Sequence, residues 1–131
     1  MITGIGTDLL HIQRFQDILE SGTSALFINR VFTQLEQELV VAHAQPLLYW
    51  AGRFACKEAV FKALQTSWEP ADAATDIEII GEEKSTLRVN LYGRFKLLIE
   101  GCAGQVFVSL SHDGDFVLAF AAVEAGNNRV R

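Results

Sequence analysis

At 131 residues, 50% of them hydrophobic, the chain has enough apolar material to fold as one globular domain without disulfide bonds. Its net charge of -5 at pH 7 argues against a nucleic-acid partner, because proteins that bind nucleic acids usually present a basic face. The first residues do not resemble a secretory signal and no apolar run is long enough to span a bilayer, so a cytoplasmic protein with no membrane partner is expected.

The chain is expected to begin with a strand and a helix. Residues 1–9 follow the two-residue period of a strand, in which Gly4, Gly6 and Asp8 share one face. Asp8 is expected to end this strand. An amphipathic helix is expected over residues 12–21, because apolar residues recur there at helical spacing.

Two further helices are predicted by their start signals. Thr33, with Glu36 three residues later, predicts a capping box and a second helix that runs to about His43. Pro46 is typical of the first turn of a helix, and the residues that follow are rich in Ala, Leu and Lys. A third and longer helix is therefore expected over residues 47–65.

The second half of the chain predicts short strands around one helix. The expected elements are strands 76–80 and 86–92 joined by a polar turn at 81–85, a helix at 93–101, and a hairpin of strands 106–111 and 116–124. This order predicts an α+β fold with a largely antiparallel sheet packed against the long helix. One domain is expected over residues 1–124, followed by a frayed tail over residues 125–131.

Two charged side chains continue the apolar stripe of the long helix. At 100° per residue, Glu58 and Lys62 fall in the same sector as apolar residues such as Phe54. A carboxylate in an apolar environment has a raised pKa and becomes neutral unless a cation or hydrogen-bond donors keep it ionised. Glu58 therefore needs a partner. One interpretation is a structural ion pair with Lys62, one helical turn away.

Asp8 favours a second interpretation, in which two acids bind a cation. Asp8 and Glu58 together form a ligand set that Mg²⁺ uses when waters and phosphate oxygens complete its octahedral shell. Lys62 would then face the phosphate. The alternative for the segment GIGTD is close backbone packing, with Asp8 capping the next helix. A dinucleotide-binding fingerprint fits less well, because Leu9 occupies the third glycine position.

The segment SLSHDGD holds the last candidate side chain. His112 is expected at the end of a strand beside a tight turn, where an imidazole can reach a phosphate or a carboxylate. A serine nucleophile with His112 as its base is an alternative, but the strained serine turn of the hydrolases is missing. A hydrogen-bonded surface histidine is the other interpretation.

Four sequence motifs together resemble one protein family. They are GIGTDLLHIQR at residues 4–14, RVFTQLE at 30–36, RFACKEAVFKAL at 53–64 and SLSH at 109–112. In this order, and along nearly the whole length, the chain resembles the holo-[acyl-carrier-protein] synthase family of small, trimeric 4'-phosphopantetheinyl transferases. The motifs are weak singly and highly specific in combination.

The resemblance implies a location for each part of coenzyme A in an α+β fold. Asp8 and Glu58 would hold Mg²⁺ against the pyrophosphate, and Lys62 would contact the phosphates. The cofactor-binding residues that the resemblance adds are Arg53, Thr66 and His112, of which Arg53 and His112 would help to bind the nucleotide end. In this family the pocket lies between neighbouring subunits of a homotrimer, so His112 is expected to act across an interface.

The resemblance also implies a reaction and a protein partner. A serine hydroxyl of an apo acyl carrier protein attacks the phosphorus that bears pantetheine, and adenosine 3',5'-bisphosphate leaves. Glu58, directly or through a water, is the candidate acceptor of the hydroxyl proton. Carrier proteins are acidic and dock on the first helix in this family, where Arg14 lies on the expected outer face.

The loop after the long helix departs from the family pattern. Where the family usually has glycines, this chain has Gln65 and Ser67 in the segment LQTS, so the loop is expected to bind coenzyme A differently or less tightly. Two other functions stay open. One is a Mg²⁺-dependent phosphoester hydrolase that uses Asp8, Glu58 and Lys62, and the other is an inactive oligomeric binding module of the same fold.

Overall fold

The computed structural model describes residues 1–81 and 86–126. The predicted turn at 81–85 and the predicted frayed tail lie, apart from Gly81 and residues 125–126, outside these ranges. The elements in chain order are β1 (Ile2–His11), α1 (Ile12–Leu19), α2 (Ser24–Val31), α3 (Gln34–Leu39), the 3-10 turn η1 (Val40–Ala42), α4 (Pro46–Ala63), the 3-10 turn η2 (Ala74–Asp76), β2 (Ile77–Ile80), β3 (Arg88–Leu91), α5 (Gly93–Gly101), β4 (Gln105–Asp113) and β5 (Phe116–Glu124).

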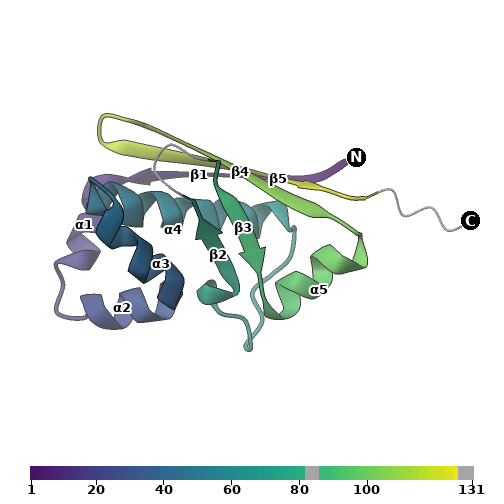
Figure 1. Cartoon of the computed structure of the whole chain (residues 1–131), viewed down its shortest axis with the longest axis horizontal. Helices are drawn as coiled ribbons and strands as arrows, with labels where there is room; N and C mark the ends of the chain where they lie inside the picture. The colour runs from purple at the N-terminus through teal and green to yellow at the C-terminus, as the bar shows by residue number, and fades with distance from the viewer. Residues whose placement is uncertain (82–85, 127–131) are drawn as a thin grey trace, which may run out of the picture.

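The strands divide between two antiparallel sheets. One sheet has the order β1-β5-β4, and the other pairs β2 with β3. Figure 1 shows the larger sheet as a layer along α4, with α1, α2 and α3 at one end and α5 at the other. The predicted α+β class and antiparallel pairing are confirmed, but the strands form two sheets where one was expected.

Strand β1 lies directly on helix α4 because two glycines allow it. A Cβ atom on Gly6 would lie 2.1 Å from the carbonyl oxygen of Ala59, and one on Gly4 would lie 2.0 Å from that of Ala63. Any side chain at either position would force the strand off the helix. The interpretation of these glycines as close backbone packing is therefore confirmed.

The core surrounds α4. Buried residues of α1, β2 and α5, such as Phe15, Ile77 and Phe95, belong to it together with the layer between α4 and the larger sheet. Strand β5 alternates buried and exposed residues, and its buried residues are Val117, Ala119, Ala121 and Val123. Helix α4 contributes Ala51, Ala55 and Ala59 to the same core, each fully buried. These small side chains let the helix and the sheet approach closely.

A set of buried charged side chains, which we call the β2 clamp, holds the free edge of β2. Lys57 of α4 donates to the carbonyl of Ile77, Glu36 of α3 accepts from the backbone N–H of Ile79 at 2.9 Å, and Arg53 of α4 donates to the carbonyl of Gly81 at 2.7 Å. The β2 clamp thus consists of Glu36, Arg53 and Lys57. Lys57 also pairs with Glu36 at 2.8 Å, and burial lowers the pKa of the Lys57 ammonium.

Three local predictions differ from the structure. Strand β1 continues beyond Asp8 to His11, whose side chain accepts a hydrogen bond at the start of α1, so Asp8 neither ends the strand nor caps the helix. Helix α2 was not predicted. The capping box of Thr33 and Glu36 is present, but α3 ends at Leu39 and continues as a 3-10 turn.

In the described part of the chain, no helix is both long and apolar enough to cross a membrane.

Candidate active site

Asp8, Glu58 and Lys62 come together where β1 passes over α4. The ammonium of Lys62 lies 3.4 Å from Oδ1 of Asp8 and donates to the carbonyl of Thr7 at 2.9 Å. The Lys62 side chain is 51% exposed and that of Asp8 is 19% exposed. A ligand in solvent can therefore reach both groups.

Glu58 is the electrostatically perturbed member of this group. Burial raises the pKa of its carboxyl, the charge of Asp8 raises the pKa further, and Lys62 opposes both effects. Among the described residues, Lys62 forms its ion pair with Asp8. The interpretation in which Lys62 simply pairs with Glu58 along the helix therefore does not describe the site. A pair of carboxylates that repel each other attracts a cation.

These two acids fit Mg²⁺ better than a metal that takes all its ligands from protein. In the part of the chain that the structure describes, no group of three or more His, Cys, Asp and Glu side chains is placed to hold a metal ion. Mg²⁺ is usually bound by one or two carboxylates, with waters and substrate phosphates as its other ligands. Asp8 and Glu58 meet this requirement, and Lys62 beside them suits a phosphate.

Arg53 and His112 line one cavity of about 410 Å³. Arg53 is 3% exposed, its guanidinium lies 4.3 Å from the centre of the Tyr49 ring, and its Nη2 donates to Gly81. Its Nε is buried and has no hydrogen-bond partner within the described ranges. A buried cationic donor without a partner costs free energy, which an anion in the cavity would offset.

The two groups of candidate residues lie on opposite edges of the larger sheet. Asp8 is on β1 and His112 is on β4, while β5 separates these strands. Asp8 faces Ala119 of β5 across one ladder, and Leu110 faces Ala119 across the other. Asp8 and the His112 cavity are therefore separated by the middle strand, within a single subunit.

Thr66 lies in the loop after α4, which Arg94 of α5 holds in place. Arg94 donates to the hydroxyl of Thr66 at 2.9 Å and to Asp72 at 2.6 Å, and this pairing lowers the pKa of the Asp72 carboxyl. The preceding residue, Gln65, has φ of 55°, the left-handed conformation that glycine adopts most readily. The loop thus keeps a glycine-like backbone at a position where this chain has glutamine.

Arg14 lies exposed on α1, as predicted. The nearby acids already have partners, because Gln13 donates to Asp17 of α1 at 3.0 Å and Gln16 donates to Glu20, the residue after α1, at 2.8 Å. Arg14 therefore remains available to an acidic partner.

Sequence reasoning did not find Arg94, Tyr49 or the pair of Glu36 and Lys57. Their contacts join residues far apart in the chain, so no local pattern marks them. One signal was present for Glu36, since its side chain also serves the capping box of Thr33.

Comparison with known proteins defines the family. A model of the 4'-phosphopantetheinyl transferase superfamily matches residues 4–121. The holo-[acyl-carrier-protein] synthase of Geobacter metallireducens is 36% identical over 125 residues, which cover 95% of this chain and 98% of that protein. The chain therefore belongs to the holo-[acyl-carrier-protein] synthase family of that superfamily, and the predicted class of enzyme is confirmed.

Solved structures support the same assignment. The crystal structure of a holo-[acyl-carrier-protein] synthase from Neisseria meningitidis matches with a TM-score of 0.83 and 30% identity, covering 95% of this chain and 99% of that one. The Helicobacter pylori holo-[acyl-carrier-protein] synthase in complex with coenzyme A matches with a TM-score of 0.75 and 27% identity, covering 92% and 99%.

Proposed function

We propose that this chain transfers the 4'-phosphopantetheine group from coenzyme A to a serine of an apo acyl carrier protein. The observation that carries the proposal is the convergence of Asp8, Glu58 and Lys62 at an accessible site. The similar Helicobacter pylori enzyme was solved with coenzyme A bound, which supports the choice of donor. Asp8 and Glu58 would hold Mg²⁺, which supplies charge neutralisation to the pyrophosphate when it is bound.

In the transfer step the serine hydroxyl oxygen forms a bond to the phosphorus that bears pantetheine. The bond from this phosphorus to the bridging pyrophosphate oxygen breaks, and adenosine 3',5'-bisphosphate leaves with the electron pair. The hydroxyl proton passes to Glu58, directly or through a water. Lys62 stabilises negative charge on the phosphates.

We propose further that the chain acts as a homotrimer with active sites between subunits. The outer face of the larger sheet carries large apolar side chains that are at least 40% exposed: Ile5, Leu9, Phe107, Phe116, Leu118 and Phe120. A contiguous apolar face of this kind is typical of a protein interface. The separation of Asp8 from His112 supports the arrangement, since the β1 edge of one subunit and the β4 edge of a neighbour would together form one site.

The experiment that tests the proposal is intact-mass spectrometry of an apo acyl carrier protein after incubation with the enzyme, coenzyme A and Mg²⁺. The expected result is a mass gain of one 4'-phosphopantetheine group and release of adenosine 3',5'-bisphosphate. A Glu58→Gln variant serves as the control and should leave the carrier unmodified. Release of phosphate from coenzyme A without any carrier would favour the hydrolase, and unmodified carriers of several types would favour the binding module.

A further inference from the structure

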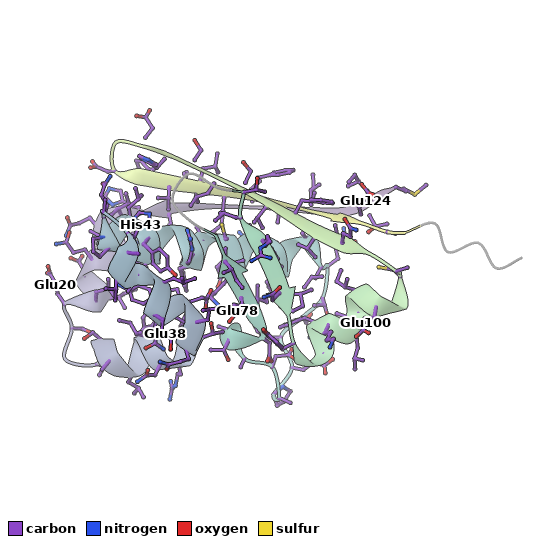
Figure 2. All side chains as sticks on the ribbon, viewed as in Figure 1. Glu20, Glu38, His43, Glu78, Glu100 and Glu124 are labelled. Atoms are coloured by element: carbon purple, nitrogen blue, oxygen red, sulfur yellow. The ribbon has the colours of Figure 1, made fainter. Side chains whose placement is uncertain are left out.

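The loop that follows α4 begins beside the candidate active site. The N–H of Gln65 donates to the carbonyl of Lys62 at 3.1 Å, so the loop leaves the helix within one turn of this lysine. The loop also adjoins β1, because a Cβ atom on Gly4 would lie 3.5 Å from Cγ of Gln65. Helix α5, on which Figure 2 labels Glu100, lies at the end of the molecule where α4 ends. A residue of α5 can therefore reach the loop.

The guanidinium of Arg94, on α5, binds three groups that are spread along this loop. Its Nη1 donates to the hydroxyl oxygen of Thr66 at 2.9 Å, and its Nη2 donates to the carbonyl of Ser67 at 2.8 Å. Its Nε and Nη2 donate to the two carboxylate oxygens of Asp72, at 3.1 Å and 2.6 Å. A planar guanidinium holds its donors in a fixed fork that can span such acceptors, whereas the ammonium of a lysine is a single point charge. One side chain thus fixes both ends of the loop.

The contact with Arg94 decides how the hydroxyl of Thr66 can bind a ligand. A guanidinium can only donate, so the oxygen of Thr66 accepts in this contact. The hydroxyl hydrogen is then left to be donated to another group. Because the neighbouring cation polarises the hydroxyl and adds positive charge beside it, the preferred acceptor is an anionic oxygen such as that of a phosphate.

We propose that Arg94 is a positioning residue of the coenzyme A site, which holds Thr66 so that its hydroxyl donates to a phosphate oxygen of coenzyme A. This inference rests on the proposed function and on the expected contact between Thr66 and coenzyme A. It gives Arg94 the task of ordering a loop in which Gln65 and Ser67 stand where the family usually has glycines. A loop that is held before the substrate arrives loses less conformational entropy on binding.

Two substitutions separate this role from a purely structural one. Arg94→Lys keeps a cation beside Asp72, but one ammonium cannot also serve Thr66 and the carbonyl of Ser67. Thr66→Val removes the hydroxyl, preserves the shape of the side chain and leaves the pairing of Arg94 with Asp72 in place. Arg88→Lys, at an exposed arginine of β3, is the matched control.

Three measurements are made on the intact protein: calorimetric titration with coenzyme A in the presence of Mg²⁺, the kinetics of carrier modification, and urea denaturation. We expect Arg94→Lys and Thr66→Val each to weaken binding of coenzyme A about tenfold, as for one hydrogen bond to a charged group. The KM for coenzyme A should rise with little change in kcat. The double variant should also lose about tenfold, because both substitutions remove the same contact, and Arg88→Lys should bind as wild type does.

Two results would overturn the proposal. One is wild-type affinity for coenzyme A in Arg94→Lys or in Thr66→Val, whatever the change in stability, since a purely structural role lowers the free energy of unfolding alone. The other is a loss of about a hundredfold in the double variant, which would mean that Arg94 and Thr66 act independently. If the wild-type protein binds coenzyme A but modifies no carrier, the proposed function fails while the titrations still decide the role of Arg94. If it does not bind coenzyme A, both fail.

Discussion

The ammonium of Lys62 lies 3.4 Å from the carboxylate of Asp8, although 54 residues separate them in the chain. The contact joins the last turn of α4 to the middle of β1, and the two glycines of β1 make this approach possible. Lys62 also reduces the repulsion between Asp8 and Glu58. The same lysine therefore stabilises the pair of acids, and in the proposed reaction it would face the phosphates of the substrate.

Replacing Lys62 is expected to impair catalysis much more than folding. Lys62→Met should lower kcat about 10²-fold, because the negative charge that develops on the phosphates loses a fixed cation. Stability should change by less than about 0.5 kcal/mol, because the side chain is half exposed. Transfer kinetics and thermal denaturation measure the two effects. Lys96→Met, at an exposed lysine of α5, is the matched control, and an equal loss of activity there would contradict the role of Lys62.

The raised pKa of Glu58 predicts how the stability of the metal-free protein depends on pH. Because the pKa is higher in the folded than in the unfolded state, protonated Glu58 stabilises the fold at low pH, and this contribution is lost as the pH rises through the folded-state pKa. Glu58→Gln should therefore be slightly more stable than wild type at pH 7, by about 0.5 kcal/mol after solvent screening. Urea denaturation at pH 4 and at pH 7 measures the difference.

Addition of Mg²⁺ should make wild type more stable than Glu58→Gln, which is the reverse of the order expected without the metal. A cation between Asp8 and Glu58 removes their repulsion and stabilises the folded state by mass action. Wild type should gain thermal stability with MgCl₂, and Glu58→Gln should gain clearly less. An equal shift in both proteins would remove Glu58 from the metal site.

The left-handed backbone at Gln65 predicts a stabilising substitution. A residue with a Cβ pays about 1 kcal/mol in this conformation, whereas glycine does not. Gln65→Gly should therefore raise the free energy of unfolding by about 0.5 to 1 kcal/mol, as measured by urea denaturation. Ser67→Gly is the control, because Ser67 has no positive φ and should gain nothing. Stabilisation of both variants would show that the effect does not come from the conformation of residue 65.

The separation of the two candidate regions predicts that two defective variants complement each other in a mixed trimer. Glu58→Gln is defective at the β1 edge, and His112→Ala is defective at the β4 edge. When both are coexpressed, about a quarter of the sites in a cyclic trimer should receive two intact edges. Transfer at limiting coenzyme A should then exceed that of either variant alone. If it does not, both edges of one site belong to the same subunit.

Arg14→Glu should slow association with the acidic carrier protein without affecting coenzyme A. The exposed position on α1 makes Arg14 available for electrostatic steering, which acts mainly on the association rate. Stopped-flow binding of the carrier should show a lower association rate that depends less on salt, while titration with coenzyme A should be unchanged. An unaltered association rate would place the docking surface elsewhere.

Local patterns in the sequence predicted the elements that form the candidate active site. The two-residue period placed Asp8 on the face of β1 that meets α4, and the helical period placed Glu58 and Lys62 on one stripe. Both periods follow from backbone geometry, so they can be read without tertiary information. The candidate site could be proposed from the sequence because β1 and α4 each carry their candidate residues on one face.

Contacts between distant segments could not be predicted in the same way. Helix α2 has no side-chain hydrogen bond at its amino-terminal cap, and its apolar residues would suit a strand equally well. It is held by packing of Phe27 against Phe15 and Phe54. The bond from Arg94 to Thr66 spans 28 residues, and neither residue lies in a periodic segment with the other. Such contacts between distant residues can be identified only in the folded structure.

The β2 clamp has a consequence for how the protein behaves at high concentration. A free strand edge offers unpaired amides and carbonyls to any other extended chain, which is a common start of aggregation. Along β2 these groups are bound instead by Lys57, Glu36 and Arg53, at alternate residues from Ile77 to Gly81. An incoming strand would have to displace a buried ion pair before it could add to this edge, so the small sheet is closed to growth on that side.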